Sequence, residues 1–148
     1  MSVDNKIQDL FIKNNWTLSL AESCTGGAIS ALLVQIPGCS RYFLGSIVSY
    51  SNQAKAKLLN VVADEKVSEL CAMQMATGAK EQFQSTYALS VTGCAGPTGN
   101  KIGTVCFALA TPDKVVAKTE YFGGDRHEVI HQALEETLYF LWNYVSTS

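Results

Sequence analysis

The chain has 148 residues, 47% hydrophobic residues and a formal net charge of −2, which suits one domain, residues 1–148, with its own core. This charge gives no electrostatic basis for binding nucleic acid. No apolar run approaches the roughly 20 residues that a membrane-spanning helix needs, and the N-terminal residues mix charge into apolar positions, unlike a signal peptide. We therefore expect a cytoplasmic protein that binds neither nucleic acid nor membrane.

The first half of the chain alternates helical and extended patterns. Apolar spacing predicts a helix over about residues 2–14 and a strand over residues 16–21. A second helix follows a pair of glycines and ends before Pro37 and Gly38, because proline and glycine terminate helices. Residues 42–51 predict a strand, and residues 52–60 predict a short helix.

The second half predicts one long helix, three strands and a final helix. Apolar residues recur at helical spacing over residues 67–83, and residues 87–93 predict a strand that runs into a glycine-rich segment. Residues 103–111 and 115–122 predict a hairpin, and the last helix starts near Asp125. Strands that first alternate with helices and then form a hairpin predict an α/β fold, a three-layer α/β/α single domain with a mixed sheet.

The cysteines and histidines do not predict a metal or disulfide site. Five cysteines are an odd number and no C-x-x-C pair occurs, so neither a disulfide framework nor a zinc site is favoured. His127 and His131 are four residues apart on the predicted last helix, but the sequence signals no further ligand beside them. A solvated helix face is the better interpretation, and we expect no metal and no cofactor.

Small and polar residues occupy the corner between the first strand and the second helix, from Ser23, Cys24 and Thr25 to Gly26 and Gly27. In open α/β sheets ligands bind beyond the carboxyl ends of strands. Backbone N–H groups and the helix dipole favour an anion at such a corner, and glycines admit it closely. The corner is therefore a candidate site for a phosphate or oxyanion, with a serine or cysteine nucleophile. The alternative is a structural corner in which Ser23 or Thr25 caps the helix.

A second corner contains a lysine in an unfavourable place. If Asn52 caps the helix, Lys55 is its third residue, where a capping box has Glu or Gln. The positive end of the dipole disfavours the ammonium form, which would lower the pKa of Lys55 and suit it to act as a general base. Tyr50 would then hold or relay a proton. The alternative is a solvated Lys55 with Tyr50 packed at the sheet edge, and Lys57 is expected to face water.

Two further corners lie later in the chain. Thr92 and Gly93 end a strand before a tight glycine-rich turn, which either admits a ligand or only reverses the chain. Asp125 and Glu128 fit a capping box. Arg126 is then the first helical residue, beside free N–H groups, which suits a carboxylate or phosphate ligand better than it suits helix stability. A surface arginine is the alternative.

Together these corners resemble the CinA C-terminal domain family, whose enzymes are the nicotinamide-nucleotide amidases of the PncC type. The resemblance covers about residues 5–145 and includes a specific combination, "AESCTGG" with a downstream "YSN-x-x-K" and "TG-x-AGP". The resemblance implies hydrolysis of nicotinamide mononucleotide to nicotinate mononucleotide and ammonia, in pyridine-nucleotide recycling. The motifs that carry it are "AESCTGG", "PGCSRYFLGSIVSYSNQAKAKLL", "VTGCAGP", "GTVCFALAT" and "GGDRHEV".

The resemblance also assigns roles to residues. The family's nucleophilic serine falls on Ser23, its tyrosine and lysine fall on Tyr50 and Lys55, and its arginine falls on Arg126. In the implied mechanism Lys55, directly or through Tyr50, takes the Ser23 proton, and Ser23 attacks the carboxamide carbon and expels ammonia. Backbone N–H groups of residues 24–27 would stabilise the oxyanion. We further infer that Arg126 and the helix N-termini hold the substrate phosphate.

The sequence departs from the family pattern in two places. The segment between Val61 and Val67 is short, whereas family members usually have a longer stretch ending in Gly-Ala-Val-Ser. The loop after Pro97 lacks the usual glycine-rich extension. Both differences lie near the expected pocket and bear on the choice of substrate, and no counterpart of the large N-terminal domain of full-length CinA proteins is expected within residues 1–148.

Two other functions remain open at this point. The chain is a catalytically inactive nucleotide-binding or regulatory homologue if the shortened loops remove activity. Alternatively Cys24 is the nucleophile, since a thiol at a helix N-terminus has a lowered pKa. The family also implies a homo-oligomer, a dimer or larger, and a small-molecule nucleotide as the partner.

Overall fold

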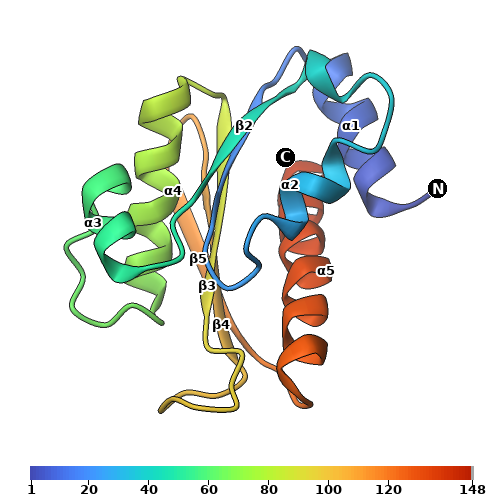
Figure 1. Cartoon of the computed structure of the whole chain (residues 1–148). Helices are drawn as coiled ribbons and strands as arrows, with labels where there is room; N and C mark the ends of the chain where they lie inside the picture. The colour runs from blue at the N-terminus through green and yellow to red at the C-terminus, as the bar shows by residue number, and fades with distance from the viewer. Residues whose placement is uncertain (148) are drawn as a thin grey trace.

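The computed structural model describes residues 1–147, which form three layers, with a sheet between two groups of helices (Figure 1). Helices α1, α2 and α5 cover one face of the sheet, and α3 and α4 cover the other. The elements are α1 Val3–Lys13, β1 Leu18–Glu22, α2 Ala28–Leu33, η1 Cys39–Arg41, β2 Phe43–Val48, α3 Asn52–Leu59, α4 Glu69–Phe83, β3 Tyr87–Gly93, β4 Thr104–Ala110, β5 Val115–Tyr121 and α5 Arg126–Val145.

The sheet is mixed, as predicted, with strand order β2-β1-β3-β4-β5. Strands β2, β1 and β3 are parallel, whereas β4 and β5 are antiparallel to their neighbours and form the predicted hairpin. The carboxyl ends of the three parallel strands therefore lie at one edge of the sheet. Ligands bind at this edge in open α/β sheets, and the corners after β1, β2 and β3 meet there.

The two faces of the sheet have different cores. The face toward α1 and α5 packs aromatic rings, in which Phe11 contacts Trp16, Tyr42 and Tyr87 with ring centroids 5.5–5.6 Å apart. The face toward α4 is built largely from alanines, together with Cys71, Met75 and Cys106. Small side chains let α4 approach the sheet closely and bring α3 with it.

A close contact between Gly78 and the backbone of Leu59 holds α3 against α4. A Cβ added to Gly78 of α4 would lie 2.5 Å from the carbonyl oxygen of Leu59, the last residue of α3. The glycine thus allows the end of α3 to rest on α4. Because Lys55 belongs to α3, this contact also sets the position of the lysine relative to the sheet.

The sequence predicted every α-helix and strand of the fold, but not the short 3-10 helix η1. The clearest difference is that α2 ends at Leu33 instead of extending to residue 36. Proline at position 37 disfavours helical backbone in the residue before it, and residues 34–36 form turns. Within residues 1–147, no helix combines the length and apolar character that crossing a bilayer requires.

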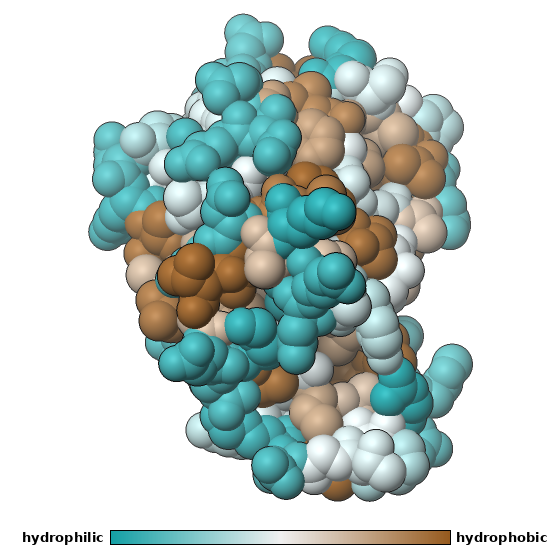
Figure 2. All heavy atoms as spheres, turned by 60° about the vertical axis from the view of Figure 1, so that its left-hand side comes forward, coloured by the Kyte–Doolittle hydropathy of each residue, from teal (hydrophilic) through white to brown (hydrophobic). Residues whose placement is uncertain are grey.

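The outer face of the molecule mixes polar and apolar side chains. Figure 2 shows the side that carries α3 and α4, where hydrophilic side chains are interleaved with separate apolar patches. Leu58 of α3 and Val62 after it are 46% and 78% exposed. Lys57 is also exposed, as predicted.

Candidate active site

A cavity of about 340 Å³ lies where β1, β2 and β3 end, within the roughly 300–1,000 Å³ typical of small-molecule pockets. It draws residues from both sides of the sheet, including the start of α5 and the segment between α3 and α4. The lining residues are Ser23, Cys24, Tyr50, Asn52, Lys55, Lys66, Val67, Thr92, Gly93, Cys94, Ala95, Gly96, Thr98 and Arg126.

Most of the residues singled out in the sequence line this cavity. The three predicted catalytic residues do so, and so do four of the predicted binding residues. Thr25, Gly26 and Gly27 are not among the lining residues. The set that the fold brings together is Ser23, Cys24, Tyr50, Lys55, Thr92, Gly93 and Arg126.

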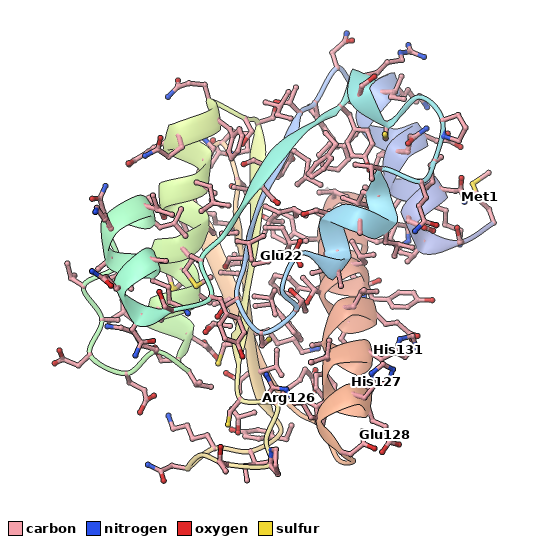
Figure 3. The ribbon with its side chains drawn as sticks, viewed as in Figure 1. Met1, Glu22, Arg126, His127, Glu128 and His131 are labelled. Atoms are coloured by element: carbon pink, nitrogen blue, oxygen red, sulfur yellow. The ribbon has the colours of Figure 1, made fainter. Side chains whose placement is uncertain are left out.

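The N-terminus of α2 is already occupied by a carboxylate from the chain itself. Glu22 is fully buried at the end of β1, between the sheet and α2 (Figure 3). Its Oε1 accepts hydrogen bonds from the backbone N–H groups of Gly27 and Ile29 and from the Thr25 hydroxyl, at 2.6–3.2 Å. Its Oε2 accepts from the backbone N–H and the hydroxyl of Ser30, at 2.9 and 2.5 Å.

These bonds correct two expectations about the first corner. Neither Ser23 nor Thr25 is the N-cap of α2; that residue is Gly27, with a φ of 102° that favours glycine. The N–H group of Gly27 is also not available to a substrate anion, because it donates to Glu22. The sequence signal was an acidic residue directly before the corner, where a helix dipole stabilises negative charge.

Ser23 and Cys24 differ in their fitness as nucleophiles. Ser23 is 4% exposed and lines the cavity, and no hydrogen bond joins its hydroxyl to any group of residues 1–147. Burial raises the pKa of the Cys24 thiol to about 12, so the thiol is protonated at neutral pH. The expectation of a lowered pKa at this cysteine is therefore wrong, because desolvation outweighs the nearby positive charges.

Lys55 is buried, with 2% of its surface exposed. Its Nζ donates to the carbonyl oxygens of Ser49 and Tyr50, both at 3.0 Å. The helix begins at Asn52, but its N-cap is Ser51 and not Asn52, since the Ser51 hydroxyl accepts from the N–H of Ala54. The pKa of Lys55 is lowered, as predicted, but the main cause is burial and not the helix dipole.

Tyr50 and Arg126 meet at the mouth of the cavity. Asp125 and Glu128 form the predicted capping box of α5, and Arg126 is the first helical residue. The guanidinium donates from Nη2 to the Tyr50 hydroxyl at 2.8 Å and from Nη1 to the carbonyl of Gly96 at 2.6 Å. Arg126 therefore links the corners after β2 and β3 to the start of α5.

Lys66 and Val67, from the segment between α3 and α4, line the cavity together with residues of the loop after β3. The hydroxyl of Thr92 donates to the carbonyl of Lys66 at 2.8 Å. Lys101 reaches across to the carbonyl of Val67 at 3.1 Å and to the carboxylate of Glu65 at 3.5 Å. The sequence analysis did not identify Lys66 as a site residue. The available signal was that Lys66 lies in the segment between Val61 and Val67, which departs from the family pattern.

The two histidines lie outside the cavity on an exposed face of α5, as predicted. The exposed histidines lie on the side of α5 away from the sheet (Figure 3), and His131 Nε2 is 2.7 Å from Glu135 Oε1. All five cysteines are free. In the described part of the chain, no group of three or more His, Cys, Asp or Glu is arranged to hold a metal.

Comparison with known proteins identifies a family. The family model described as CinA C-terminal domain matches residues 1–145. A CinA-like protein of Fervidobacterium nodosum is 46% identical over 132 residues, 83% of this chain and 32% of that protein. A CinA-like protein of Geotalea uraniireducens is 47% identical over 137 residues, 86% of this chain and 33% of that protein. The chain thus spans about a third of the length of these relatives.

Solved structures have the same fold. A CinA superfamily protein from Klebsiella pneumoniae superposes with a TM-score of 0.93 at 28% identity, covering 99% of this chain and 97% of that one. A CinA superfamily protein from Escherichia coli gives 0.90 at 30% identity, covering 94% and 86%. These matches agree with the single-domain α/β architecture described above.

Proposed function

Because the chain belongs to the CinA C-terminal domain family, we propose that it is an amidase that converts nicotinamide mononucleotide to nicotinate mononucleotide and ammonia, in cytoplasmic pyridine-nucleotide recycling. One observation carries the proposal: an unbonded Ser23 hydroxyl shares a cavity with a buried lysine whose pKa is lowered. A serine and a neutral lysine are a known chemical basis for acyl transfer without histidine.

The hydrogen bonds of Lys55 are consistent with a neutral amine. A neutral amine has two hydrogens and one lone pair, whereas an ammonium has three hydrogens and no acceptor. The carbonyls of Ser49 and Tyr50 accept two hydrogen bonds from Nζ. A neutral Lys55 therefore keeps its lone pair free to accept a proton.

The reaction then proceeds in two steps. Lys55, through a bridging water or the Tyr50 hydroxyl, takes the proton of Ser23 while its oxygen attacks the carboxamide carbon. The C–N bond breaks, the proton passes to the leaving nitrogen, and ammonia departs from an acyl-serine ester. Water, deprotonated by the same lysine, attacks the ester and releases the carboxylate and the Ser23 hydroxyl.

Because Glu22 occupies the N–H groups at the start of α2, other groups are the candidates for binding the substrate. The backbone N–H group of Cys24, which lines the cavity and donates to no other residue's backbone in the described chain, is the candidate oxyanion donor. Such donors typically contribute about 10²–10³ in rate each. Arg126 uses two of its five N–H donors within the protein, and the others are assigned to the substrate phosphate.

The test is incubation of the purified chain with nicotinamide mononucleotide, with separate measurement of ammonia and nicotinate mononucleotide. We expect both products in equal amounts, and loss of both in Ser23→Ala and Lys55→Ala. Folding of each variant is checked by circular dichroism. Absence of turnover across pH 6–10 in the folded wild type would reject the proposal.

A non-catalytic nucleotide-binding domain is the second candidate function. It is favoured by the bonds from Lys101 to Val67 and Glu65, which join the two loops that depart from the family pattern. It is also favoured by the lack of a direct hydrogen bond between Lys55 and Ser23 within residues 1–147. Its signature is tight binding of nicotinamide mononucleotide without product formation. The homo-oligomer that the family implies is a further proposal, which the mass in solution tests.

A further inference from the structure

The cavity carries positive charge that no acidic group in its lining balances. Lys66 and Arg126 supply it beside the neutral amine assigned to Lys55, and no Asp or Glu is among the described lining residues. Within residues 1–147, neither Lys66 nor Arg126 forms an ion pair. The whole chain, by contrast, has a formal net charge of −2. Local positive charge in a cleft of an acidic protein favours an anionic ligand.

Lys66 is held in place by contacts to the cavity wall. Its Nζ donates to the carbonyl of Ala63, and its own carbonyl accepts from the hydroxyl of Thr92 at 2.8 Å. The side chain is half-buried. An ammonium has three hydrogens, so the bond to Ala63 leaves donors for a ligand.

Lys66 and Arg126 approach the cavity from opposite faces of the sheet. Lys66 belongs to the segment that joins α3 and α4, whereas Arg126 begins α5, which covers the other face (Figure 1). A phosphate monoester carries nearly two negative charges and three acceptor oxygens. Cations on two sides match that ligand better than they match a monovalent carboxylate.

We propose that Lys66 and Arg126 together form a phosphate-monoester subsite, and that Lys66 determines the preference of this cavity for a nucleotide over the corresponding nucleoside. The identity of the remaining ligand rests on the proposed function, but recognition of the phosphate does not. Burial is the main cause of the lowered pKa of Lys55, and the positive charge of Lys66 lowers it further. The same side chain thus contributes to phosphate binding and to keeping the base neutral.

Calorimetric titration tests the proposal, in a Ser23→Ala background so that the ligand is not turned over. The probes are nicotinamide mononucleotide, nicotinamide riboside and inorganic phosphate. Lys66→Gln removes the charge but keeps a donor for Ala63, and Lys66→Arg keeps the charge. Lys57→Gln is the matched control, because Lys57 is exposed and does not line the cavity.

We expect Lys66→Gln to weaken binding of the mononucleotide and of phosphate about tenfold, as for loss of one charged hydrogen bond. Riboside binding is expected to stay unchanged, Lys66→Arg to bind the mononucleotide nearly as well as the parent, and Lys57→Gln to have no effect. Equal weakening of riboside and mononucleotide by Lys66→Gln, or no weakening of either, overturns the proposal.

The outcome is separable from that of the amidase proposal. Binding that depends on Lys66, in a wild-type chain that releases no ammonia, supports the phosphate subsite and rejects the amidase. Ammonia release with the same KM in wild type and Lys66→Gln supports the amidase and rejects the subsite.

Discussion

The guanidinium of Arg126 donates a hydrogen bond of 2.8 Å to the hydroxyl of Tyr50, which joins residues 76 positions apart in the chain. The same guanidinium is bound to the carbonyl of Gly96. Three chain segments thus meet at one planar group, whose fixed fork of donors can serve several acceptors at once.

Arg126→Lys is expected to raise the KM for nicotinamide mononucleotide about tenfold, with a smaller change in kcat. A lysine ammonium cannot donate to Tyr50, Gly96 and a phosphate in the same planar arrangement. Steady-state kinetics measure both constants, and His127→Ala, an exposed neighbour on the same helix, is the control. An unchanged KM in Arg126→Lys contradicts the assignment of this residue to the phosphate.

The pH dependence of kcat/KM is expected to report the ionisation of Lys55. Only the neutral amine accepts a proton, so the rate rises as pH increases through the pKa of Lys55 and levels off above it. Burial lowers that pKa from its ordinary value of 10.5, so the midpoint of the rise lies below pH 10.5.

Lys66 supplies an internal check on this profile. Its positive charge contributes to the lowering of the Lys55 pKa, so Lys66→Gln is expected to move the midpoint to higher pH. Lys57→Gln is expected to leave the midpoint unchanged. A profile that falls with pH, or one that is the same in wild type and Lys66→Gln, would argue against Lys55 as the base.

Glu22→Gln is expected to lower the free energy of unfolding by about 3 kcal/mol, because a buried amide nitrogen would face N–H donors that now bind a carboxylate oxygen. Urea unfolding followed by circular dichroism measures the change. Glu81→Gln is the matched control, since Glu81 is exposed on α4. Equal stabilities of the two variants would show that the Glu22 hydrogen bonds contribute little.

Gly78→Ala is expected to destabilise the protein by about 1–3 kcal/mol, although alanine favours helices, because the added Cβ would press on the Leu59 carbonyl. Displacement of α3 would also move Lys55, so kcat should fall with stability. Gly123→Ala is the control, since a Cβ there meets nothing within 4 Å. A stabilised Gly78→Ala variant would contradict the close contact between α3 and α4.

Periodicity was enough to predict the elements of this fold, because each helix and strand buries one regular set of side chains. The capping box of Asp125 and Glu128 was also readable, since its two bonds join residues three positions apart. The position of Arg126 followed from that box. The hydrogen bonds of Arg126 to Tyr50 and Gly96 could not be predicted in this way, because those residues lie at other corners of the fold.

The site was less predictable where a tertiary contact replaced a local one. The sequence assigned the N–H groups at the start of α2 to a ligand, whereas Glu22 occupies three of them. The lowered pKa of Lys55 was predicted from the helix dipole, but burial under the end of β2 is the main cause. Lys66 is held at the cavity wall by a hydrogen bond from Thr92 to its carbonyl, 26 positions away in the chain. No local sequence pattern predicts such a bond.

The buried carboxylate of Glu22 has a consequence for how the pocket can diversify. Since this carboxylate occupies the N–H groups of Gly27, Ile29 and Ser30 at the start of α2, attraction of a ligand phosphate is left to side chains on loops and helix starts. Side chains can be exchanged one at a time without rebuilding the backbone. Descendants of this scaffold can therefore acquire new ligand preferences by single replacements around the rim while the corner that presents Ser23 stays intact.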